Sequence, residues 1–95
     1  MAKSNRTLNY HLSPNNGASE EAVFLLDSLP VRPTMIHIET SSSKIHVAFH
    51  PSADATVNDF LLSANIDNPF ELASRRVSVY NDDTMAKDVY IAAEY

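Results

Sequence analysis

The chain has 95 residues, of which 44% are hydrophobic, enough for one conventional core and too many for a disordered chain. Its net charge is −5, and its 7 basic residues are scattered, so direct binding to nucleic acid is disfavoured. Cysteine is absent, which excludes disulfides and thiolate sites, and no apolar run is long enough to span a membrane.

The first predicted elements are a strand and a helix. Residues 6–12 alternate apolar and polar side chains, as a half-buried strand does. A helix is predicted over residues 18–28, because acidic side chains occupy its first turn, apolar side chains recur at helical spacing from Ala22 to Leu29, and Pro30 ends it.

Residues 35–50 predict a β-hairpin with one apolar face and one face that bears histidines. Apolar residues alternate with polar ones on both sides of the polar run at residues 40–43. Folding the chain at this run would place His37 opposite His46, with Cβ atoms about 4.5–5.5 Å apart.

The rest of the chain predicts strands over residues 75–80 and 89–93 and a second helix over residues 55–65, whose buried stripe would be Val57, Phe60, Leu61 and Ala64. The order is β-α-β-β-α-β with an extra C-terminal strand. It predicts a ferredoxin-like α+β sandwich, in which two helices cover one face of an antiparallel sheet and the other face stays open. We expect residues 1–5 to be a flexible N-terminus without a signal peptide, and residues 6–95 to be a single domain of a cytoplasmic protein.

The pattern resembles the heavy-metal-associated domain, and the resemblance spans about residues 8–66. It is carried by the run Leu-Asp-Ser-Leu-Pro-Val at residues 26–31, the paired strands at 35–49, and His50-Pro51. It implies a ferredoxin-like fold. The Cys-x-x-Cys motif of that family would fall near Asn15 and Ala18, so the thiolate metal site is not implied.

Three histidines, His11, His37 and His46, are expected to converge on the open face of the sheet. Imidazole suits zinc and copper, and a metal site needs at least three protein ligands. The simpler interpretation is that solvent-facing strand positions hold polar residues. We therefore predict no cofactor, with zinc or copper at these histidines as the alternative.

The same open face is predicted to bind a protein partner. Tyrosine is favoured in binding surfaces, although tyrosines also cover half-exposed sheets. No nucleophile motif indicates an enzyme. We therefore predict a non-enzymatic interaction or regulatory module that binds a protein, or a second copy as a homodimer, through the open face or an edge strand. The predicted contact residues are Asn9, His37, His46, Arg76, Tyr80 and Tyr90.

Overall fold

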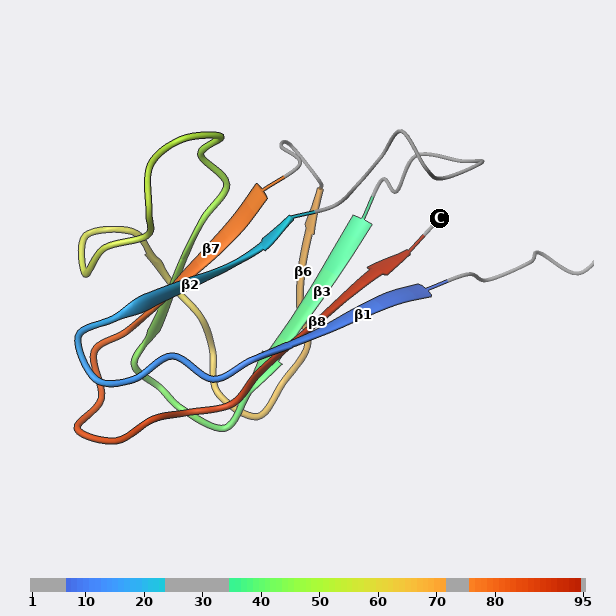
Figure 1. The fold of residues 1–95 in the computed structure, drawn as a ribbon. Helices are drawn as coiled ribbons and strands as arrows, with labels where there is room; N and C mark the ends of the chain where they lie inside the picture. The colour runs from blue at the N-terminus through green and yellow to red at the C-terminus, as the bar shows by residue number, and fades with distance from the viewer. Residues whose placement is uncertain (1–6, 24–34, 72–75, 95) are drawn as a thin grey trace, which may run out of the picture.

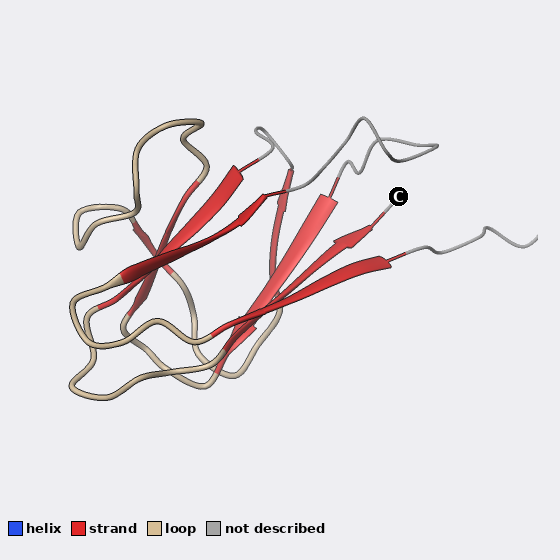
Figure 2. Cartoon of the chain, viewed as in Figure 1, coloured by secondary structure: helices blue, strands red, loops and turns tan. Residues whose placement is uncertain are grey.

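The computed structural model describes residues 7–23, 35–71 and 76–94, which form two four-stranded antiparallel sheets (Figure 1). Sheet A has the order β1-β8-β3-β6 and sheet B the order β2-β7-β4-β5. The strands are β1 (Thr7–Leu12), β2 (Ser19–Val23), β3 (Met35–Thr40), β4 (Ile45–Ala48), β5 (Phe60–Leu61), β6 (Asn68–Glu71), β7 (Arg76–Asn81) and β8 (Val89–Glu94). The described residues contain no helix (Figure 2), and hence none that could cross a membrane.

The strand pairs are nested along the chain. β1 pairs with β8, β2 with β7, β3 with β6 and β4 with β5, as in one long antiparallel ribbon whose tip lies between β4 and β5. Two further pairings, β3 with β8 and β4 with β7, wrap this ribbon into two sheets. This is the connectivity of the double-sheet jelly roll. The predicted α+β ferredoxin-like sandwich, which the family resemblance also implied, is therefore wrong.

The strands of the predicted hairpin exist, but they do not pair with each other. β3 belongs to sheet A and β4 to sheet B, and the polar run between them carries the chain across the sandwich. Two buried side chains hold this crossing. The Thr40 hydroxyl donates to the Asp88 carbonyl at 2.8 Å, and the Ser42 hydroxyl donates to the Asp83 carboxylate at 3.2 Å. The apolar alternation predicts which side chains are buried, but it does not predict the partner strand.

Strand β2 occupies the first half of the predicted helix at residues 18–28, and residues 24–28 lie outside the described residues. All five residues of β2 pair with β7, and the Glu21 carboxylate forms an ion pair with Arg76 on that strand. Ala22 is buried as predicted, but it points from a strand into the core between two sheets and not from a helix onto one sheet. Local helix preference is a weak force, which pairing along a whole strand overrides.

The second predicted helix, residues 55–65, is instead a loop, a turn and the short strand β5. The Thr56 amide donates to the Asp59 carboxylate at 2.7 Å, and the Asp59 amide donates to the Thr56 carbonyl at 3.0 Å. These bonds form one closed turn, which competes with a continuing helix. Phe60, on the predicted buried stripe, is 61% exposed, whereas Leu62, off that stripe, is 2% exposed.

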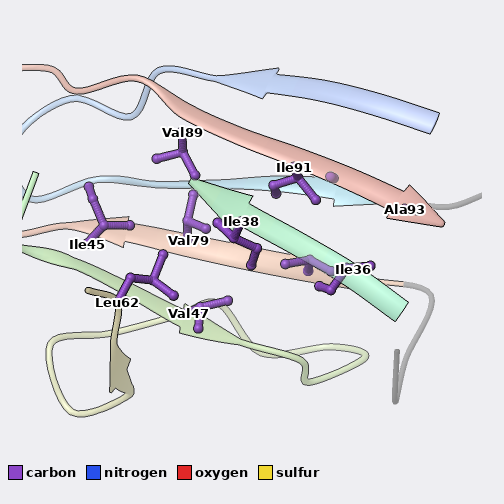
Figure 3. Close-up of a cluster of buried hydrophobic side chains, with 11 residues drawn as sticks. Ile36, Ile38, Ile45, Val47, Leu62, Val79, Val89, Ile91 and Ala93 are labelled. Carbon is purple, nitrogen blue, oxygen red and sulfur yellow. The ribbon is translucent and has the colours of Figure 1, made fainter. Parts of the chain in front are cut away.

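One hydrophobic core fills the space between the sheets (Figure 3). Alternate residues of every long strand point into it, so each of these strands has one buried face and one outer face. The cluster of fully buried side chains comprises Ala22, Ile36, Ile38, Ile45, Val47, Leu62, Val77, Val79, Val89, Ile91 and Ala93. Because the core occupies the inner faces, chemistry or binding on the sheets is restricted to the two outer faces and the sheet edges.

Candidate functional site

The outer face of sheet B is covered over β4 and β7 by a loop of the chain itself, residues 50–59, whereas Glu21 and Val23 of β2 remain exposed. The Ala55 amide donates to the Ser78 hydroxyl of β7 at 2.8 Å, and His46 Nδ1 of β4 donates to the Asp59 carbonyl at 3.0 Å. Ala55 is 3% exposed and His46 is 8% exposed. This loop therefore occupies the surface that a partner would need.

Arg76 fastens the same loop to sheet B. Its guanidinium forms ion pairs with Glu21 and Asp54, and it donates to the Ala53 carbonyl at 2.5 Å. The hydrogen bond that Arg76 donates to Glu21, followed by the one that it donates to Asp54, raises the pKa of Arg76. The side chain is 13% exposed, so its donors serve the loop and not an external ligand.

The outer face of sheet A has a half-exposed aromatic pair at its centre. Tyr90 on β8 lies opposite His11 on β1 and opposite Glu39 on β3, and these strands run side by side in Figure 1. The Tyr90 and His11 rings are stacked, with centroids 4.7 Å apart and planes inclined by 8°. Tyr90 is nevertheless 53% exposed. Sheet A thus presents a flat aromatic surface to solvent.

A depression of about 420 Å³ lies beside this aromatic pair. Its floor is Ala92 on β8, whose short side chain lies between Asn9 of β1 and His37 of β3. Tyr90 and Glu39 line this depression and also a second one of about 410 Å³, which reaches the corner after β3. The Tyr90 and Glu39 side chains therefore lie where the two depressions meet, and the lining of the first depression is mainly apolar.

The structure divides the six predicted contact residues between the two outer faces. Asn9, His37 and Tyr90 lie on the outer face of sheet A and line the first depression. His46, Arg76 and Tyr80 lie on the outer face of sheet B, next to the loop that covers it. The division arises because β4 and β7 belong to sheet B, whereas the prediction placed every strand in one sheet.

The three histidines predicted to converge are separated in the same way. His11 and His37 belong to sheet A, and His46 to sheet B, so the core lies between them. Among the described residues, no group of three or more His, Cys, Asp or Glu side chains is arranged to hold a metal ion. Zinc or copper at these histidines remains a prediction, and this geometry supplies no common ligand set for it.

Ser13, His11 and Asp88 form a cluster with the composition of a catalytic triad but not its geometry. In a triad, one ring nitrogen of histidine accepts the serine proton while the other donates to the carboxylate. Here His11 Nε2 faces both groups, at 3.3 Å from Ser13 Oγ and 2.8 Å from Asp88 Oδ1, and Ser13 Oγ donates directly to Asp88 at 2.9 Å. The hydrogen bond from His11, and then that from Ser13, lowers the pKa of Asp88. The cluster fixes the end of β1 to the start of β8.

His37 is held between two carboxylates on the outer face of sheet A. Its Nδ1 lies 2.8 Å from Asp67 Oδ2, and its Nε2 lies 3.2 Å from Glu94 Oε2. The hydrogen bond to Asp67 is the main cause that raises the pKa of His37, and Glu94 adds to it. A protonated ring donates through both nitrogens, and so links β3 to β8 and to the segment before β6.

We expect His37 to stabilise the protein at acidic pH. Because its folded pKa lies above the ordinary value of 6.5, its contribution is complete below pH 6.5 and is lost as the pH rises through the folded pKa. The partners are exposed, so the effect should stay below about 1 kcal/mol. NMR titration should give a ring midpoint above 6.5, and His37→Asn should lower the unfolding free energy more at about pH 5 than at about pH 8. A midpoint at or below 6.5 would contradict this account.

Glu39 and Ala92 are two outer-face residues of this region that belong neither to the predicted contact residues nor to the three predicted metal-site histidines. Both lie on the outer face of sheet A, because their neighbours in the chain, Ile38 and Ile91, point into the core. A sequence signal existed for Ala92. An alanine between Tyr90 and Glu94 on the outer face of a strand leaves a gap between larger side chains.

Comparisons of the chain with protein-family models, with curated proteins and with solved structures each found no match. The function is therefore inferred from the geometry of the two outer faces and of the sheet edges.

Proposed function

We propose that this chain is a non-enzymatic interaction module that binds a protein partner through the outer face of sheet A. One observation carries the proposal, the unequal cover of the two faces. The loop at residues 50–59 covers β4 and β7 in sheet B, whereas Tyr90 stands half-exposed in the middle of sheet A beside a depression. Exposed tyrosine next to a concavity with a few polar side chains is typical of binding surfaces.

A second candidate surface is the β5 edge, and it favours self-association. β5 is the terminal strand of sheet B, so one side of its backbone lacks a neighbouring strand in the described sheet. Large apolar side chains are exposed on and around it: Val57, Phe60, Leu61 and Ile66. Unprotected edges with apolar side chains tend to pair with another strand. Two β5 edges related by a twofold axis would give a homodimer.

One matched pair of variants separates the two surfaces. Tyr90→Ala and Phe60→Ala each remove an exposed aromatic ring, one from sheet A and one from the β5 edge. We expect Tyr90→Ala to reduce the partner captured by cross-linking at least about tenfold, as for a hot-spot residue, while Phe60→Ala retains it. Light scattering measures self-association of the same proteins.

Thermal unfolding must first show that both variants are folded. Loss of binding or of dimer in Phe60→Ala alone would favour the β5 edge. If neither variant changes the amount of partner captured or the molar mass measured by light scattering, both proposed surfaces are contradicted.

A further inference from the structure

Apart from His11, which pairs with Asp88, and His37, which pairs with Asp67 and Glu94, the charged side chains on the outer face of sheet A are carboxylates. Carboxylates are contributed by β3, β6 and β8, and by the segments that precede β6 and β8: Glu39, Glu71, Glu94, Asp67 and Asp88. Of the lysines and arginines in the described part of the chain, none lies on this face. Arg76 is engaged on sheet B, Lys87 lies 3.9 Å from Asp83, and Lys44 precedes β4. The face therefore attracts a cationic partner and repels an acidic one.

The centre of this face has two groups ready for a cation. Glu39 is exposed, and among the described residues its carboxylate has no hydrogen-bond or ion-pair partner. One side of the Tyr90 ring is stacked on His11 from β1, so its other side is turned toward β3, where Glu39 lies opposite it. Both residues line the two depressions. An aromatic face next to an unpaired carboxylate suits a flat cation.

We propose that the depression beside Tyr90 binds an arginine side chain from a basic segment of a protein partner. This rests on the proposed function, that sheet A is the binding face. The guanidinium stacks on the free side of the Tyr90 ring and pairs with the Glu39 carboxylate, while the segment crosses the floor at Ala92. Arginine fits better than lysine, because its planar group can stack and donate two parallel hydrogen bonds at once.

A pair of short peptides tests the proposal with the intact chain. One is a Gly/Ser peptide with two arginines and blocked ends, and its control carries neutral citrulline in place of arginine. In NMR titration we expect the arginine peptide to shift the amide signals of Glu39, Tyr90 and Ala92, with a dissociation constant of about 1 mM at low salt. High salt should weaken this binding.

Matched carboxylate variants separate a local site from diffuse charge. Glu39→Gln and Glu71→Gln remove the same charge from the same face, but Glu71 lies on β6, away from Tyr90. We expect Glu39→Gln to weaken the arginine peptide about fivefold, and Glu71→Gln by less than about twofold. Equal weakening by both variants, or equal binding of the citrulline peptide, would overturn the arginine site. So would the absence of any shift.

Failure of the arginine site and failure of the proposed function would give different results. If Tyr90→Ala loses a captured partner while the arginine peptide does not bind, sheet A is the binding face for a ligand of other chemistry, such as a neutral peptide or a sugar. If Tyr90→Ala keeps its partner, sheet A is not the binding face, whatever the peptide does.

Discussion

Replacing Leu62 with alanine should lower the free energy of unfolding by about 2–5 kcal/mol, measured by urea denaturation. Leu62 follows β5 directly and belongs to the core cluster between the sheets (Figure 3). Its amide also donates to the Ile45 carbonyl at 2.9 Å, which holds the backbone in place, so the cavity left by the side chain cannot close easily. A loss of this size is a large part of the stability of a small domain.

Leu61→Ala is the matched control, because the two leucines are adjacent and differ in burial. Leu61 is 49% exposed, so we expect its truncation to change stability by no more than about 0.5 kcal/mol. The helical interpretation of residues 55–65 makes the opposite prediction, since it buries Leu61 and exposes Leu62. A larger loss in Leu61→Ala than in Leu62→Ala would contradict the arrangement of β5.

The second large effect is expected at Asn81, a fully buried polar residue at the end of β7. Its side-chain amide donates to the carbonyls of Pro14 and Met85, each at 2.8 Å, and its oxygen accepts from the Asp83 amide at 2.8 Å. Asn81→Ala removes all three bonds and leaves two carbonyls without this donor. We expect a loss of about 2–4 kcal/mol in chemical denaturation.

Two further variants test this explanation. Asn81→Asp keeps the size and the acceptor oxygen but loses the donor, so it should cost at least as much as Asn81→Ala at neutral pH. Asn58→Ala is the control, because Asn58 is exposed, and it should change stability by no more than about 0.5 kcal/mol. Similar losses of stability in Asn81→Ala and Asn58→Ala would show that the buried amide does not hold together the loop after β1 and the loop after β7.

The sequence predicted most of the buried strand residues but not the sheets to which they belong. Ile36, Ile38, Ile45 and Val47 are buried as the alternation of residues 35–49 indicates, because a period of two depends only on the local backbone. The partner of each strand is set by distant segments. A polar run such as residues 40–43 fits a hairpin turn and a crossing between sheets equally well.

The prediction of two helices was wrong because a short run of apolar residues matches the period of a helix and the period of a strand equally well. Phe60, Leu61 and Leu62 are consecutive, so some of them match any helical stripe, and only the pairing of β5 with β4 decides which one is buried. Strand β6 was missed because it is short and contains Pro69, which discourages a strand prediction. As in other sheets, this proline lies on an edge strand.

The candidate site could be predicted in part. Asn9, His37 and Tyr90 share one outer face because the alternation of each strand sends them away from the core, and because their strands are neighbours. The sequence pattern could not predict that the loop at residues 50–59 covers His46. This cover depends on a loop that returns to sheet B through hydrogen bonds from residues distant in the chain, such as Ala55 to Ser78.

The nested order of the strands also has a consequence for how the chain folds during synthesis. β8 lies between β1 and β3, and it joins Thr7 to Glu94 across almost the whole described chain. Sheet A therefore cannot assemble until β8 has left the ribosome, and until then β1 and β3 have no strand to join them. Until then the edges of β1 and β3 that β8 will cover stay open, which is the condition under which unpaired strands are prone to aggregate.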